Sequence, residues 1–241
     1  MKKKPHRIAA ALLLITASAP ALAEIDRLQT LSQQEFHLLA EDLGAALSYK
    51  PLQPTAPLGV LGFDVGVAAT ATRLKHPELF ERATGNGDFP STVVVPSVRA
   101  SLGLPFGFDV SGMYSTVPKT GVTLAGGALS WAVIAGDAAL PAVGLRASYT
   151  KMFGVDQLDF YSGGLDASIS KGFGPVTPYI GAGRVWSAST PQSTTGLRRE
   201  SLAQTKVFGG LGFKVALVNF VIEYDRTGPA NSYGAKLGLR F

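Results

Sequence analysis

The last ten residues of the chain alternate between two kinds of side chain. Apolar residues occupy every second position, and small or charged residues occupy the positions between: Tyr233, Ala235, Leu237, Leu239 and Phe241 against Ser232, Gly234, Lys236, Gly238 and Arg240. A period of two residues is that of a β-strand whose two faces meet different environments. This segment is therefore predicted to be a strand between an apolar medium and a polar one.

The same alternation recurs from residue 58 onward in runs of about ten residues. About ten such strands are predicted, near residues 58–72, 92–103, 107–116, 122–135, 142–152, 160–171, 177–188, 203–214, 218–226 and 232–241. Short links such as Leu104–Phe106 alternate with longer polar ones such as Leu74–Pro90 and Ala188–Ser201. The pattern predicts an all-β fold, a closed antiparallel barrel that crosses a membrane with its short turns on the periplasmic side.

The aromatic residues fall into two belts when the short links are placed together. Near the ends that carry the longer loops lie Tyr114, Tyr149, Tyr161, Trp186, Tyr224 and Tyr233, and near the other ends lie Phe106, Phe108, Tyr179, Phe213, Phe220 and Phe241. Amphipathic rings collect at the two interfaces of a membrane. A soluble all-β protein would share the alternation, but the two belts favour the membrane.

Two of the predicted strands fit the pattern poorly. In the fourth, Val122 and Leu124 are out of phase with Trp131, which predicts a bulge near Gly126 and Gly127. In the seventh, Arg184 shares a face with otherwise apolar residues, and we expect this side chain to turn to the lumen.

The N-terminal residues 1–23 have the layout of a secretory signal peptide. Lys2–Lys4 and Arg7 precede an apolar run, and Ala21-Leu22-Ala23 precedes Glu24. Removing these four of the 22 basic residues and none of the 17 acidic ones leaves the mature chain near +1, so no nucleic-acid partner is predicted. The chain has no cysteine, hence no disulfides.

Residues 24–57 differ from the rest of the chain. Ser32 and Glu35 form a capping box, and a helix from Gln33 to Ser48 follows, with an apolar stripe. Pro51, Pro54 and Pro57 then make a stiff lead into the barrel of residues 58–241. We expect a periplasmic helix at the barrel rim rather than a plug in the lumen, because an apolar stripe suits a polar lumen badly. Both ends of the mature chain are then periplasmic.

The signal peptide, the alternating strands and the C-terminal strand ending in Phe241 resemble the outer-membrane β-barrel proteins of Gram-negative bacteria, including uncharacterised proteobacterial ones. The resemblance covers residues 58–241 and is architectural. It implies that Phe241 is part of an assembly signal, and that periplasmic chaperones and the barrel-assembly machinery are transient partners. It also implies an outer-membrane location, among lipid and lipopolysaccharide.

The sequence offers little for catalysis. Barrel enzymes of the resembling class, including lipid-modifying and omptin-like enzymes, use a histidine, and the chain has three: His6, His37 and His76. None lies on a predicted strand, so a Ser–His pair facing lipid cannot form. An omptin-like site of His76 with Asp88, Asp156 or Asp159 is the weakest alternative. We predict no enzyme, no cofactor and no metal site, since no cluster has metal-ligand spacing.

Charges of both signs are predicted to face the lumen: Asp64, Arg99, Asp109, Arg146, Asp166, Lys206, Lys214, Glu223, Asp225, Lys236 and Arg240. They fit a salt-bridged interior, and thus a structural or interaction barrel. They also fit a narrow, porin-like channel for ions or small solutes. Because about ten strands enclose little more than side chains, the first interpretation is favoured. The sequence leaves the oligomeric state open.

Overall fold

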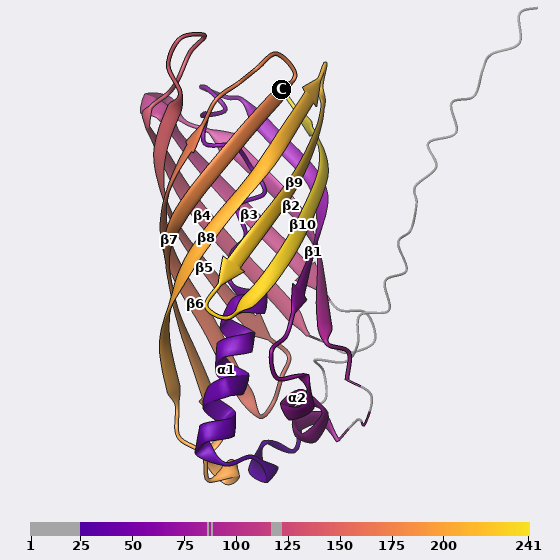
Figure 1. The fold of residues 1–241 in the computed structure, drawn as a ribbon. Helices are drawn as coiled ribbons and strands as arrows, with labels where there is room; N and C mark the ends of the chain where they lie inside the picture. The colour runs from indigo at the N-terminus through magenta and orange to yellow at the C-terminus, as the bar shows by residue number, and fades with distance from the viewer. Residues whose placement is uncertain (1–24, 86, 88, 117–121) are drawn as a thin grey trace, which may run out of the picture.

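The computed structural model describes residues 25–85, 87, 89–116 and 122–241 (Figure 1). The predicted signal peptide, residues 1–23, lies outside these residues. Two α-helices, short 3-10 turns and ten strands make up the fold.

The ten strands form one closed barrel, which confirms the predicted fold class. Every strand pairs antiparallel with its neighbours in sequence, and the barrel closes where the first strand pairs with the last, from Asp64 opposite Arg240 to Arg73 opposite Asn231. Predicted and observed bounds differ by a few residues, most at the first strand. The strands are β1 (Phe63–Arg73), β2 (Thr92–Gly103), β3 (Phe108–Thr116), β4 (Thr123–Ile134), β5 (Ala142–Phe153), β6 (Leu158–Ser170), β7 (Val176–Pro191), β8 (Glu200–Val215), β9 (Val218–Thr227) and β10 (Ala230–Arg240).

The alternation in the sequence separates the inside of the barrel from the outside. On β10, the side chain of Leu237 is 54% exposed on the outer face, whereas its neighbour Lys236 is 3% exposed inside. Because closure pairs the backbone groups of both edges, the pleat alone decides which face each residue takes. The predicted facing of this strand is confirmed.

The predicted bulge at Gly126 and Gly127 is wrong. Strand β4 pairs in unbroken register from Thr123 to Ala132, and the irregularity lies between Ala132 and Ile134. Leu124 is buried and faces inward, because this end of the lumen is apolar. The expected inward turn of Arg184 is also wrong, since this residue is exposed on the outer face beside Trp186.

Helix α1 (Gln33–Leu47) begins at the predicted capping box. The Ser32 hydroxyl accepts a hydrogen bond from the Glu35 backbone N–H, and the Glu35 carboxylate accepts one from the Ser32 N–H at 2.8 Å. None of the described helices is long and apolar enough to cross a membrane.

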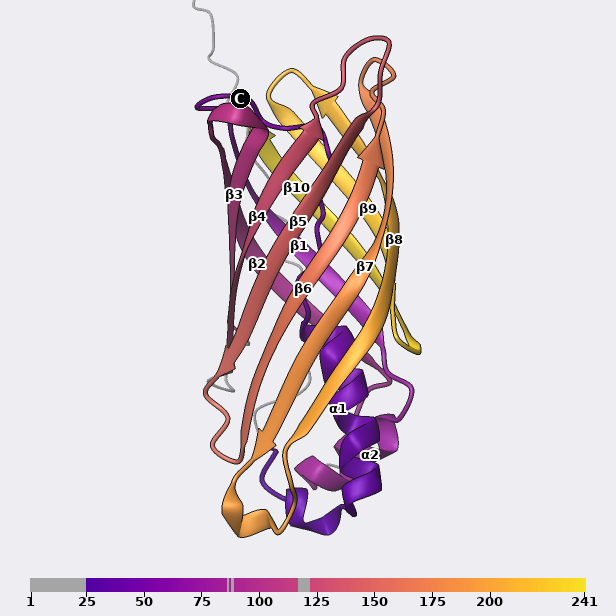
Figure 2. The same ribbon diagram turned by 90° about the vertical axis from the view of Figure 1, so that its left-hand side faces the viewer.

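The predicted position of this helix, at the rim beside the C-terminus, is wrong. Helix α1 enters the opposite mouth of the barrel and contacts β1, β7, β8, β9 and β10. Figures 1 and 2 show it at the end that carries helix α2 (Pro77–Thr84), the short turn η2 (Leu28–Thr30) and the longer loops, far from the C-terminus.

An apolar half of the lumen explains why an apolar helix fits there. The buried stripe of α1 packs against apolar side chains that the strands point inward at this end, and against α2. The cluster includes Phe36, Leu39, Leu43, Leu47, Leu79, Phe80, Val93, Val95, Met113, Leu124, Met152, Leu158 and Phe160. The expected mismatch between helix and lumen does not arise, because the lumen is charged only in its other half.

From α1 the chain runs through the barrel to its other end, where β1 begins (Figure 2). We call residues 48–58 of this stretch the internal segment. Its prolines, Pro51, Pro54 and Pro57, have no N–H, so they lessen the number of donors that the interior must satisfy. The described N-terminal residues and Phe241 therefore lie at opposite ends of the barrel, and the expectation that both ends lie on one side is wrong.

Candidate functional site

The charged half of the lumen holds most of the predicted inward charges. Nine of them are buried inside the barrel: Asp64, Arg99, Asp109, Arg146, Asp166, Lys206, Glu223, Asp225 and Lys236. Lys214 lies at the end of β8 and is exposed, while Arg240 is partly buried at the same end and donates to the Ala56 carbonyl at 3.4 Å.

These charges pair with one another and with the internal segment. All the pairing side chains are at most 7% exposed. The nitrogen to oxygen distances are 2.5 Å for Lys50–Asp225, 2.9 Å for Lys236–Asp64, 3.3 Å for Arg146–Asp166 and 3.7 Å for Lys206–Asp166. Opposite charges thus replace water inside the barrel.

Strand side chains also bind the backbone of the last turn of α1 and of the internal segment. Three strand side chains donate hydrogen bonds to backbone carbonyl oxygens of this stretch: Thr150 to Leu47 at 2.9 Å, Lys206 to Tyr49 at 2.9 Å and Arg99 to Lys50 at 2.7 Å. Two carboxylates accept from its N–H groups: Glu223 from Leu52 at 2.9 Å and Asp109 from Leu58 at 3.1 Å. The lumen charges therefore act as hydrogen-bond partners for a polypeptide strap.

Tyr179 does not belong to the aromatic belt in which it was predicted. It faces inward, is buried, and donates its hydroxyl hydrogen to Glu223 at 2.6 Å. Its inward neighbour on the strand is Gly181, where an added Cβ would approach the Phe208 ring at 2.3 Å. Strand parity thus places this ring in the core.

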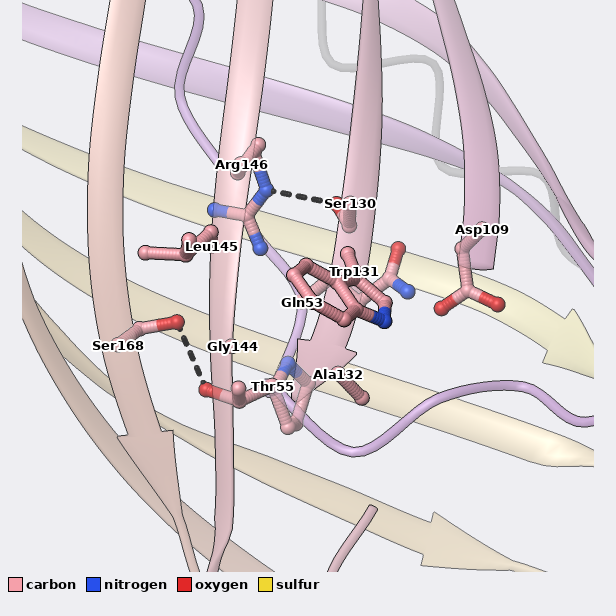
Figure 3. Close-up of a pocket in the computed structure, with 11 residues that line it drawn as sticks. Gln53, Thr55, Asp109, Ser130, Trp131, Ala132, Gly144, Leu145, Arg146 and Ser168 are labelled. Atoms are coloured by element: carbon pink, nitrogen blue, oxygen red, sulfur yellow. Dashed lines mark hydrogen bonds between the residues drawn. The ribbon is translucent and has the colours of Figure 1, made fainter. Parts of the chain in front are cut away.

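The internal segment leaves little free space. Residues 42–54 are buried without a break. Two cavities lie beside the segment, with volumes of about 10 and 30 Å³, room for one or two water molecules. Figure 3 shows the smaller one, where Thr55 donates to Ser168 at 2.8 Å and Arg146 points toward Ser130.

Three polar junctions fix α1 in the loop-bearing mouth. The first joins Glu35 to Arg82 of α2 at 2.6 Å, and the second joins Nδ1 of His37 to Glu200 of β8 at 2.9 Å. Hydrogen bonds from Arg82 and Ser32 lower the pKa of Glu35 to about 2.

The third junction is the buried carboxylate of Asp42. It accepts hydrogen bonds from the backbone N–H groups of Lys75 at 3.0 Å and His76 at 2.8 Å, and burial raises its pKa. His76, the residue of the omptin-like alternative, thus lies beside Asp42, with Nδ1 3.5 Å from the carboxylate. Asp88 of that alternative lies outside the described residues.

Sequence reasoning missed Lys50, Asp42 and Glu200 as site residues. Each acts by contact with an element distant in sequence. A single charge beside a proline (Lys50), within a helix (Asp42) or at the start of a strand (Glu200) carries no local signal of such a contact. In the described part of the chain, no group of three or more potential ligands could hold a metal ion.

The outer surface of the barrel is largely apolar between two belts of aromatic residues, although Arg184 of β7 is an exposed charge on this face. At the loop-bearing ends Tyr149 pairs with Tyr161 at 6.2 Å and Tyr224 with Tyr233 at 5.5 Å, between ring centroids. At the other end the pairs are Phe213–Phe220 at 6.2 Å, Phe108–Trp131 at 5.7 Å and Phe63–Phe241 at 4.4 Å. Phe106 is 89% exposed in a turn with positive φ. Fold and surface together define a closed barrel of the transmembrane type.

Comparisons with solved structures find barrels of similar fold at low identity. The chain is similar to the N-terminal β-barrel domain of Pseudomonas aeruginosa OprF, with 15% identity, a TM-score of 0.40, and coverage of 76% of this chain and 99% of that one. Neisserial surface protein A gives 13% identity and a TM-score of 0.31, with 75% and 95% covered. Ail of Yersinia pestis, solved with the heparin analogue sucrose octasulfate, gives 13% and 0.29, with 75% and 97% covered.

No protein-family model matches the sequence, and no curated protein matches it significantly.

Proposed function

We propose that this protein is an outer-membrane β-barrel with a sealed lumen, an interaction barrel rather than a channel or an enzyme. The observation that carries the proposal is the internal segment. It fills the lumen, and buried charged side chains of four strands, β2, β3, β8 and β9, bind it. A conducting path needs mobile water along its length, and a packed strap with paired charges offers none.

The outer surface supports the membrane location. A charged side chain at mid-membrane on such a face costs about 2–4 kcal/mol, and the outward positions of β10 between its two aromatic ends, Ala235, Leu237 and Leu239, are all apolar. The two belts of aromatic residues lie at the height where the lipid headgroups would begin.

The longer loops and α2 are proposed to face the cell exterior. In that orientation α1, α2 and η2 make a helical cap over the outer mouth, and this cap is the surface offered to a partner. The short turns and Phe241 then face the periplasm, where chaperones and the barrel-assembly machinery would meet the chain during insertion.

Single-cysteine labelling tests this topology cleanly, because the chain has no cysteine of its own. Gln29 is exposed on η2, and Phe173 is exposed in a turn at the other end. On intact cells, a membrane-impermeant maleimide should label Gln29→Cys and should label Phe173→Cys only after permeabilisation. The reverse result would show that the cap is periplasmic.

Planar-bilayer recordings test the sealed lumen. The intact mature protein should show no stable openings, and a variant that lacks residues 25–57 should conduct. Large, stable openings of the intact protein would refute the sealed barrel and favour a porin-like channel.

A further inference from the structure

A row of polar side chains crosses three neighbouring strands on the outer face of the barrel. Arg73 of β1 lies directly opposite Asn231 of β10, which lies directly opposite Arg226 of β9. Adjacent strands are about 4.8 Å apart, so the two arginine Cα atoms are about 10 Å apart with the amide between them. Both arginines are exposed.

Two tyrosines lie immediately on the membrane side of this row. Tyr233 and Tyr224 are opposite one another in the register, and the Tyr224 hydroxyl donates to the Asn231 amide oxygen at 3.0 Å. Because the amide oxygen accepts this bond, the NH₂ group of Asn231 remains available as a donor.

The row lies where the apolar surface of these strands ends. On β1 the outward residues from Phe63 to Ala71 are apolar, and the next outward residue is Arg73. Eight residues of a strand tilted by about 40° span about 20 Å across the membrane, close to the height of the apolar band of a barrel. The row is therefore level with lipid headgroups rather than with acyl chains.

Among the residues that the structure describes, the cations of the row have no counter-charge. Neither Arg73 nor Arg226 forms an ion pair with any residue that the structure describes, and the described outward positions of β1, β9 and β10 include no acidic residue. By contrast, buried cations such as Lys50 and Lys236 are paired.

We propose that Arg73, Asn231 and Arg226 form a binding site for the phosphate groups of a phosphorylated membrane lipid in the outer leaflet. A guanidinium binds a phosphate through two parallel N–H groups, and the Asn231 amide adds a donor between the two forks. The tyrosine pair packs beside the glycan or the upper acyl chain of the same lipid. This inference rests on the proposed membrane location.

Native mass spectrometry of the detergent-solubilised mature protein measures the site with three probes: bis-phosphorylated lipid A, lipid A of the same acyl chains without phosphates, and inorganic phosphate. The intact protein should prefer the phosphorylated lipid. The variant Arg73→Gln/Arg226→Gln should bind that lipid about tenfold more weakly or worse and lose the preference.

The matched control is Lys151→Gln/Arg184→Gln, which removes the same charge from outward positions of β5 and β7 and should keep the preference. An equal loss in the control, or an unchanged preference in the first variant, would overturn the site. Competition by inorganic phosphate at the concentration of the lipid would mean that free phosphate is the ligand and would overturn the lipid assignment.

Insertion into phosphatidylcholine vesicles separates the two proposals. An intact protein that fails to insert refutes the membrane location itself, whereas one that inserts but shows no phosphate preference refutes only the lipid site.

Discussion

Replacing Lys50 by Met removes one half of a buried ion pair inside the lumen. Lys50 Nζ lies 2.5 Å from Asp225 Oδ1, and both side chains are 3% exposed. Without the lysine, Asp225 keeps a hydrogen bond from Thr227 at 3.0 Å, and its second oxygen has no partner. A buried negative charge is then left without a counter-charge in direct contact.

Removing one partner of a buried pair costs about 3–5 kcal/mol, whereas replacing both partners by uncharged groups is often close to neutral. We expect Lys50→Met to lower the free energy of unfolding by an amount in that range. The double variant Lys50→Met/Asp225→Asn should be more stable than Lys50→Met alone, because it no longer leaves a charge unpaired.

The assay is urea unfolding of the mature protein in lipid vesicles, followed by tryptophan fluorescence and by heat-modifiable mobility on a gel. Lys75→Met is the control, since Lys75 is exposed in the loop beside α2, and it should change stability by less than about 0.5 kcal/mol.

Equal stabilities of Lys50→Met and Lys75→Met would show that the internal segment does not run through the lumen. A lysine at the barrel rim would be solvated, so its loss would leave no buried charge unpaired. If Lys50→Met fails to fold, recovery of folding in the double variant still identifies the unpaired charge of Asp225 as the cause. If Lys50→Met and the double variant both fail to fold while Lys75→Met folds, the unpaired charge of Asp225 is not the cause of the instability, and the expected cost is contradicted.

Three further outcomes are expected. The pKa of Glu35 is lowered to about 2, so its ion pair with Arg82 contributes stability above about pH 4.5, and this contribution is lost as the pH falls toward 2. Hydrogen exchange of α1 should rise in that window, and Glu35→Gln should abolish this pH dependence. Leu237→Arg places a charge on the outer face and should cost about 2–4 kcal/mol in a vesicle unfolding assay; no loss would refute the assigned facing. Deleting Phe241 removes its stack with Phe63 at the barrel seam and should lower the amount of assembled protein in membrane fractions, with unchanged amounts contradicting an assembly role.

The sequence by itself determined the ten strands and the facing of most of their residues; the expected bulge in β4 and the facing of Tyr179 and Arg184 on β7 are the exceptions. A period of two residues is local, and each outward residue of β10 could be assigned without knowing its neighbours. The capping box at Ser32 was likewise readable, because both of its partners lie within four residues.

Only the tertiary structure decided where α1 and the internal segment lie. The sequence showed an apolar stripe and a charged lumen, and the two looked incompatible. Their compatibility depends on Met113, Leu124 and Phe160, inward residues of three different strands that gather at one end of the barrel. Strand alternation reports which face a residue takes, but not what fills the space that all ten faces enclose.

The same limit applies to Lys50 and Tyr179. Their partners, Asp225 and Glu223, lie 175 and 44 residues further along the chain, so no local spacing could pair them. Barrel closure brings these groups together, and the low-dielectric interior then requires that each buried charge have a partner. The pattern along the chain thus determined the wall of the barrel, while the contents of its lumen came from contacts that exist only once the wall has closed.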